Sequence, residues 1–156
     1  MISQKSKYAL RALRALARMH PEAPLPISVI ASRESIPKKF LEQILLELKR
    51  AGFVASRRGQ RGGYLLLRRP DEITFGAILR TTEGPLVPVA CLANGGYCRD
   101  CRDKKQCTVR RVFARIAFVY GEILDNTTLA DLLDASSEGA IDGPIAIKNL
   151  VANKIH

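Results

Sequence analysis

The chain has 156 residues, a length that allows one domain with an appendage and excludes two independent hydrophobic cores. Its composition, 47% hydrophobic and 26% charged, is that of an ordinary globular protein. No apolar run approaches the ~18 residues that a membrane-spanning helix needs, and the first residues lack the apolar core of a signal peptide. We therefore expect a cytoplasmic protein with no membrane partner.

The net charge of +10 is concentrated in one half of the chain. Residues 1–70 hold 15 Lys and Arg against 4 Asp and Glu, whereas residues 71–156 hold 10 against 11. A basic half beside a neutral half indicates a surface for a polyanion such as DNA. The alternative is a charge excess that serves only solubility, so the position of the basic residues must decide between the two.

The first half of the chain is predicted to begin with two helices. Apolar residues at helical spacing predict a helix over 3–19. Three prolines within 20–26 end it, and a shorter helix fits 27–33. On the first helix, basic residues spaced by four, three and four form a cationic stripe of Lys7, Arg11, Arg14 and Arg18.

A third helix is predicted over 37–51. Ser35 and Pro37 resemble the N-cap and first-turn proline of a helix start, and Gly52 resembles a helix end. Its buried side would be one apolar stripe of Phe40, Leu41, Ile44, Leu45 and Leu48.

Two β-prone runs, 53–56 and 64–67, flank a turn with three arginines and three glycines, which predicts a hairpin. Three helices followed by a hairpin is the order of a winged helix-turn-helix. We therefore predict a mainly α fold with a small β-hairpin wing, in which residues 1–70 form a DNA-binding domain. Taken singly, the third helix is also compatible with an ordinary surface helix, and the hairpin with a solvated turn.

The DNA-reading residues should lie at the start of the third helix, because the second helix of a helix-turn-helix enters the major groove with its N-terminal residues. Those positions hold Lys38, Lys39, Glu42 and Gln43. Glutamine can pair with adenine and glutamate with the cytosine amino group, while lysines suit guanine or phosphate. The arginines of the hairpin would reach phosphates or a narrow minor groove.

The second half is predicted as four segments. Residues 71–85 form a connecting helix capped by Thr74, and 86–107 form a cysteine-rich loop. Residues 108–134 form a long helix and a last helical turn, and 135–156 form a flexible tail. The long helix repeats apolar residues at heptad spacing, which predicts dimerisation through Val109, Val112, Ile116, Val119 and Ile123.

The only cysteines, Cys91, Cys98, Cys101 and Cys107, fall within 17 residues. In a reducing compartment such a cluster favours metal, Fe–S or redox chemistry over a structural disulfide framework. A structural zinc site usually has two short Cys pairs and this loop has one, so zinc is less favoured. Loose spacing suits an Fe–S cluster better, and a thiol–disulfide switch remains an alternative.

Several segments together resemble the IscR/NsrR/RirA/CymR family of bacterial repressors, and the resemblance covers about residues 1–134. It rests on Lys-Ser-Lys-Tyr-Ala-Leu at 5–10, Phe-Leu-Glu-Gln-Ile at 40–44, Gly-Phe-Val at 52–54, Arg-Gly at 58–59, Gly-Gly-Tyr-Leu at 62–65, Ile-Thr at 73–74, Glu-Gly-Pro at 83–85 and Leu-Asp-Asn-Thr-Thr-Leu at 124–129. The family implies a homodimer with crossed long helices on a dyad-symmetric double-stranded operator. The resemblance also implies a set of DNA contacts: Ser3, Lys5, Glu42, Gln43 and, in the wing, Arg57, Arg58, Gln60, Arg61 and Tyr64.

The resemblance further implies an Fe–S cluster, [2Fe–2S] or [4Fe–4S], on three cysteines of which the last two are about five residues apart. These would be Cys91, Cys101 and Cys107. Some relatives take a fourth ligand from a histidine three residues after the last cysteine, and others from an acidic residue on the first helix of the partner subunit. Those positions here hold Arg110 and Lys7. Cys98 is then the candidate fourth ligand, and a cluster with three protein ligands is the alternative.

An enzyme with a cysteine nucleophile is the remote alternative. Such enzymes usually need a histidine base, and the chain has only His20, in a proline-rich turn, and His156, at its end. We therefore predict no enzymatic activity. A regulator that responds to a protein partner instead of a cluster, as in the CymR kind, is the other alternative.

Overall fold

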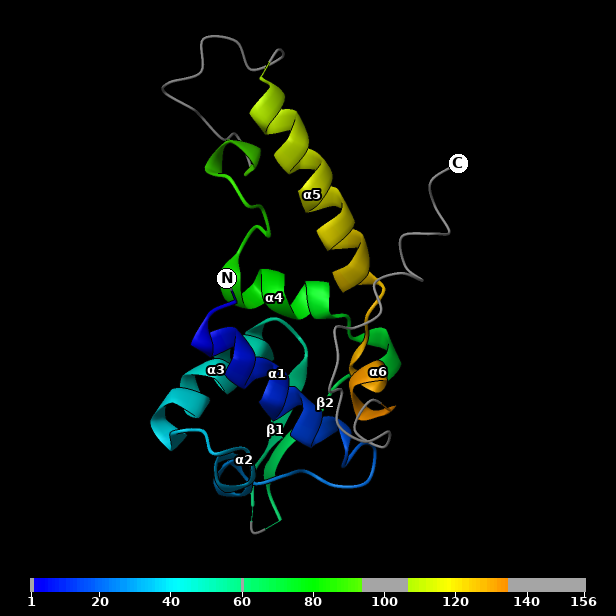
Figure 1. Cartoon of the computed structure of the whole chain (residues 1–156). Coiled ribbons are helices and arrows are strands. Elements are labelled where there is room, and N and C mark those ends of the chain that lie inside the picture. Colours follow the sequence, from blue (N-terminus) through cyan, green and yellow to red (C-terminus); the bar gives the residue numbers. More distant parts are fainter. Residues whose placement is uncertain (1, 60, 94–106, 135–156) are drawn as a thin grey trace.

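The computed structural model describes residues 2–59, 61–93 and 107–134, and shows a helical head from which one long helix projects (Figure 1). A two-stranded antiparallel hairpin extends from the opposite end of the head. The elements in chain order are α1 (Gln4–Ala17), α2 (Ile27–Glu34), α3 (Lys38–Arg50), β1 (Val54–Arg57), β2 (Gly63–Leu66), the 3-10 turn η1 (Pro70–Glu72), α4 (Phe75–Glu83), the 3-10 turn η2 (Ala90–Leu92), α5 (Thr108–Asp125) and α6 (Leu129–Asp134).

The predicted fold class is confirmed, since helices and a single hairpin occur in the predicted order. The largest difference in the first half is the end of α1, which stops at Ala17 rather than at residue 19. Thr74 caps α4 as predicted, because its side chain accepts a hydrogen bond from the Ala77 N–H. The predicted tail, 135–156, lies outside the described residues.

The predicted role of Ser35 is wrong. Ser35 does not cap α3 but ends α2, with a left-handed backbone (φ 50°, ψ 48°). The N-cap of α3 is Pro37, whose side chain accepts no capping bond. Its carbonyl instead accepts the first helical hydrogen bonds from Phe40 and Leu41.

The core of the head is built around α1, which packs against α2, α3, α4 and α6. The face of α1 that carries Ala9 and Ala12 is fully buried, and such small side chains permit close approach of the neighbouring helices. The fully buried larger apolar side chains come from every layer of the head: Leu13, Ile30, Leu41, Ile44, Leu45, Leu48, Val54, Ile73, Ile78, Leu79 and Leu129. Leu129 belongs to α6, so the chain returns to the head after α5.

The cationic stripe of α1 is partly a structural feature. Arg11 and Arg14 both form ion pairs with Glu34, at 3.4 and 3.0 Å, and only 6% of the Glu34 side chain is exposed. A buried carboxylate without a partner would cost several kcal/mol, so the two arginines are needed to hold the end of α2 against α1. Lys7 and Arg18 are exposed.

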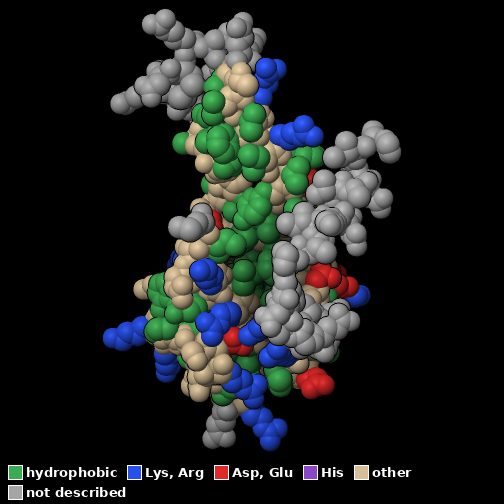
Figure 2. Space-filling model, in the orientation of Figure 1, with side chains coloured by type: hydrophobic (Ala, Val, Ile, Leu, Met, Phe, Trp, Pro, Cys, Tyr) green, Lys and Arg blue, Asp and Glu red, His purple; other side chains and the backbone are tan. Residues whose placement is uncertain are grey.

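Helix α5 leaves the head beside α4 and keeps one side uncovered (Figures 1 and 2). At its base, the Arg80 guanidinium forms two hydrogen bonds with the Asp125 carboxylate, at 2.6 and 2.7 Å. Four residues of the predicted heptad face, Val109, Val112, Ile116 and Val119, are exposed, as is the flanking Tyr120, whereas the fifth, Ile123, is half-buried. Within the described residues, no helix is sufficiently long and apolar to cross a membrane.

Candidate nucleic-acid interface

The predicted reading residues lie together on the uncovered side of α3. Lys38, Lys39, Glu42 and Gln43 are all exposed, because the opposite side of the helix is buried in the head. The amphipathic pattern that predicted the helix therefore also fixes which side is free. This side can present two amino groups, a carboxylate and an amide to a ligand.

A tight connection holds α2 and α3 in place. The left-handed Ser35 reverses the chain, and Ile36, which is 3% exposed, anchors the connection in the core. The Ile36 N–H donates to the Ala31 carbonyl at 2.9 Å, so the last turn of α2 and the connection form one unit. Two helices joined in this way have the form of a helix-turn-helix.

The hairpin is fixed to the head by backbone pairing. Arg57 pairs with Gly63 at its outer end, and Tyr64 forms a bridge with Leu25. The Leu25 N–H donates to the Tyr64 carbonyl at 2.8 Å, and the Tyr64 N–H donates back at 2.9 Å. A Cβ atom on Gly63 would overlap the Leu25 carbonyl, so this close approach requires glycine.

The predicted wing contacts occupy different environments. Arg57, Arg58 and Arg61 are exposed near the turn, whereas Tyr64 is half-buried and packs against the core. Gln60 lies outside the described residues. The three arginines thus place positive charge at the end of the hairpin.

The two predicted contacts on α1 lie at its start. Ser3 caps the helix, since its side chain accepts from the Ser6 N–H at 3.2 Å. Lys5 Nζ lies 3.3 Å from a Glu47 carboxylate oxygen of α3, and both side chains are 36% exposed. The start of α1 is therefore connected to α3, the helix that carries the predicted reading residues.

Two of the four cysteines lie in the described part of the chain. Cys91 is in η2, which packs against α5, and Cys107 is the N-cap of α5. Both are half-buried free thiols, and the Cys107 sulfur accepts a hydrogen bond from the Arg110 N–H at 3.4 Å. Cys98 and Cys101 lie outside the described residues.

These thiols are compatible with a soft metal or an Fe–S cluster, whose ligands are cysteine sulfurs. They stand at the two ends of the segment 94–106 and belong to elements that pack together. Within the described ranges, no three His, Cys, Asp or Glu side chains come close enough to hold a metal.

A polar network at the start of α1 was not predicted from sequence. The Ser3 N–H donates to Glu83 Oε1 at 2.7 Å, and the Ser6 hydroxyl donates to the same oxygen at 2.5 Å. The Ser6 oxygen also lies 2.5 Å from the Thr82 hydroxyl. The sequence contains one indication of this network. Ser6 and Thr82 are polar residues on the buried sides of amphipathic helices, where a hydrogen-bond partner is expected.

Residues 2–135 match the Rrf2 family, which is described as "Iron-dependent Transcriptional regulator". An HTH-type transcriptional regulator, rrf2-like, from Rhodobacter capsulatus is 45% identical over 146 residues, which are 90% of this chain and 97% of that protein. The solved structure of CymR, the global cysteine regulator of B. subtilis, is similar with a TM-score of 0.72 and 38% identity. That likeness covers 86% of this chain and 96% of CymR.

The structure of IscR from T. potens is similar with a TM-score of 0.70 and 31% identity, covering 92% of this chain and 93% of that protein. These relatives are transcriptional regulators and not enzymes, which confirms the predicted class of function. Their names also confirm the resemblance to IscR and CymR proteins. The chain belongs to the Rrf2 family of transcriptional regulators.

Proposed function

We propose that the protein is a homodimeric repressor that binds a dyad-symmetric operator and senses iron, redox or nitrosative state through an Fe–S cluster on the cysteines of segment 91–107. The observation that carries the DNA-binding part is the uncovered side of α3, held by a helix-turn-helix beside an arginine-tipped hairpin. In such a motif the N-terminal part of the second helix reads base edges.

The exposed side chains divide into reading and positioning groups. Glu42 and Gln43 are suited to cytosine and adenine edges in the major groove, while Lys38 and Lys39 suit guanine or phosphate. The wing arginines would contact phosphates or the adjacent minor groove, and contacts of this kind fix the register on the duplex. The family resemblance adds Ser3 and Lys5 at the start of α1.

A second copy of the chain is the partner that best explains the exposed apolar side chains of α5. Val109 is 62% exposed, Val112 54% and Ile116 49%, so an apolar row stands in water in the single chain. Exposed apolar rows of this size mark association surfaces. Pairing of two such helices would place two reading heads at the fixed spacing that a dyad-symmetric operator requires.

The cluster is proposed from the cysteine spacing and the family resemblance, with Cys91, Cys101 and Cys107 as ligands and Cys98 as the candidate fourth. When bound, an Fe–S cluster would supply a redox-active, oxygen- and nitric-oxide-sensitive group to this segment. The chain's own contribution is to hold Cys107 at the start of α5 and Cys91 in a turn against α5. A change in the ligation of these residues would therefore act on the first turn of the dimer helix, at the end of α5 that lies away from the head.

A thiol–disulfide switch is the second candidate for the sensing chemistry. It is favoured by the free thiols of Cys91 and Cys107 and by the likeness to CymR, a global cysteine regulator. Zinc and a signal from a protein partner are further alternatives. None of them changes the DNA-binding proposal.

Two measurements test the proposal. Selection from a random-sequence duplex library should enrich one sequence with two-fold symmetry, and enrichment of none would refute DNA reading. Purification without oxygen should give a brown protein with iron and sulfide in comparable amounts. A colourless protein without iron after reconstitution would refute the cluster, and stoichiometric zinc or titratable free thiols would then identify the alternative.

A further inference from the structure

The start of α1 is capped by a residue from another helix. In the common capping box, a glutamate at the third helical position accepts a hydrogen bond from the N–H of the N-cap residue. Here the N-cap is Ser3, the third position holds Ser6, and the first turn contains no acidic residue. The Ser3 N–H donates instead to Glu83 Oε1, at 2.7 Å, from the last turn of α4. Glu83 thus takes the place of the missing capping carboxylate.

A chain of hydroxyl groups strengthens this junction. The Ser6 hydroxyl donates to Glu83 at 2.5 Å and lies 2.5 Å from the Thr82 hydroxyl, which is also within 3.2 Å of the Ile78 carbonyl of α4. Ser6 is fully buried and Thr82 is 6% exposed. Hydrogen bonds to an ionised acceptor are roughly twice as strong as neutral ones. The hydrogen bonds from Ser6 and Ser3 lower the pKa of the Glu83 carboxyl from 4.5 to about 2.

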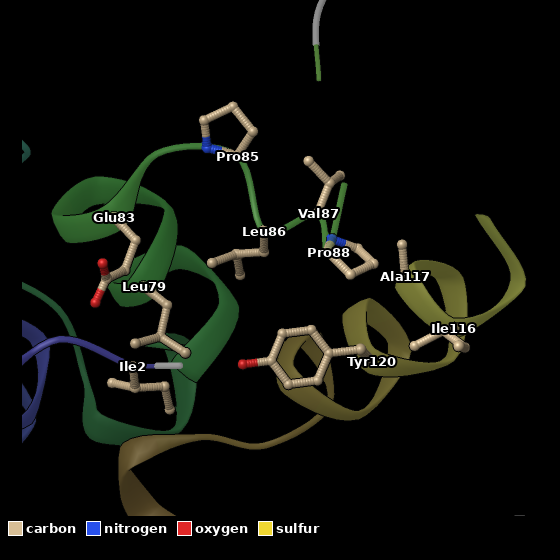
Figure 3. Close-up of a pocket in the computed structure, with 10 residues that line it drawn as sticks. All are labelled: Ile2, Leu79, Glu83, Pro85, Leu86, Val87, Pro88, Ile116, Ala117 and Tyr120. Atoms are coloured by element: carbon tan, nitrogen blue, oxygen red, sulfur yellow. The ribbon is translucent and has the colours of Figure 1, made fainter. Parts of the chain in front are cut away.

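The same residue lies where the head meets the segment that leads to the cysteines. Directly after Glu83, Gly84 has φ 82° and ψ −151°, a backbone conformation essentially confined to glycine. A cavity of about 460 Å³ lies at this point, and Figure 3 shows the residues that line it. Ile2 and Glu83 lie on one side of it, Ile116 and Tyr120 of α5 on the other, and residues 85–88 line a further edge. Four parts of the chain therefore meet around this cavity, and Glu83 lies at its edge.

We propose that Glu83 is a positioning residue for DNA binding, which fixes the first turn of α1, with Ser3 and Lys5, to the segment that follows Gly84. This inference rests on the proposed function, because it takes the start of α1 as a DNA contact. It goes beyond that function because it names one carboxylate, that of Glu83, as the link between the DNA-binding head and the segment that leads to the cysteines. A shift of residues 85–88 would move Glu83 and, through its two hydrogen bonds, the start of α1.

Three variants of the full-length protein test this role: Glu83→Ala, Glu83→Gln and, as a matched control, Glu22→Ala, which removes an exposed carboxylate in the connection after α1. The amide oxygen of glutamine can accept both hydrogen bonds that Glu83 Oε1 accepts. Removing a negative charge alone would tighten DNA binding in all three variants. Loss of the hydrogen bonds that hold the start of α1 would weaken DNA binding, and only in Glu83→Ala. The effect of charge and the effect of positioning on DNA affinity are therefore opposite in direction.

The probe is the duplex that the wild-type protein enriches from a random library, with a shuffled duplex of the same composition as reference. We expect Glu83→Ala to weaken binding to the selected duplex roughly tenfold. The slope of log affinity against log salt should fall by about 1 to 2, because each subunit then neutralises one phosphate fewer. Glu83→Gln should stay within roughly twofold of the wild type. Amide exchange at residues 4–8 should accelerate in Glu83→Ala alone.

The outcomes distinguish failure of the positioning role from failure of the proposed function. If the wild-type protein enriches no sequence, the proposed function is refuted and the inference falls with it. If it enriches one and Glu83→Ala keeps wild-type affinity, salt slope and exchange, only the positioning role is refuted. A lower melting temperature with unchanged affinity and slope of the folded protein would also refute it, because the residue would then serve stability alone.

Discussion

Dimerisation through α5 makes a quantitative prediction at Ile116. This side chain is 49% exposed in the single chain, and fully burying an isoleucine contributes about 1.5–3 kcal/mol. Covering the exposed half should contribute about half of that, and a two-fold interface contains the residue twice. Replacement Ile116→Ser should therefore weaken the dimer by about 1.5–3 kcal/mol, or roughly tenfold to a hundredfold in dissociation constant.

The matched control is Phe118→Ser on the same helix. Phe118 is 67% exposed, more than Ile116, but two residues along a helix places it about 200° around the axis, away from the heptad face. Sedimentation across a dilution series would give both dissociation constants, with circular dichroism to check helix content. An unchanged constant for Ile116→Ser, or equal weakening by both variants, would refute association through this face.

Further outcomes concern DNA binding and pH. Arg58→Ala should reduce the salt slope of operator binding by roughly 0.9 for each phosphate that the arginine neutralises, with little change in sequence preference, as measured by titrations at several salt concentrations. Gln43→Ala should relax the preference at one base pair of each half-site by about 1–3 kcal/mol, measured on single-substitution duplexes. Hydrogen bonds from Ser6 and Ser3 lower the pKa of Glu83 from 4.5 to about 2. A depressed pKa of this kind adds stability that is complete above pH 4.5 and is lost as the pH falls to about 2. The difference in melting temperature between wild type and Glu83→Gln should therefore shrink over that window, and a constant difference would contradict the assignment.

Helices could be predicted from the sequence where the spacing of apolar residues agrees with the residues that start or end a helix. The stripe from Phe40 to Leu48 and the glycine after it specify α3, and the apolar spacing from Val109 to Ile123 specifies α5. These signals are local, because each depends on residues within a few turns of one another. Burial of one side then determined which side of α3 is exposed, so the candidate reading residues could also be named.

What could not be predicted depends on contacts between distant segments. Arg11 belongs to the cationic stripe that the sequence shows on the first helix, but its pairing with Glu34, 23 residues away, was not predictable from that stripe. Ser35 had the chemistry of a helix cap, yet the tight connection into α3 requires it as a left-handed residue. Glu83 lies 80 residues from Ser3, and nothing in the local sequence of either helix shows that one caps the other.

Sensing by the cysteine segment is best tested by the affinity of one protein preparation for its selected duplex before and after that segment is changed. Anaerobic protein, iron-loaded, should be compared with the same protein after oxidation and after chelation, alongside a variant with alanine at Cys91, Cys98, Cys101 and Cys107. We predict an affinity that changes at least several-fold with the state of the wild-type protein and does not change in the variant. Equal affinities of the wild-type protein in all states would contradict sensing by this segment and leave a regulator that responds through another signal.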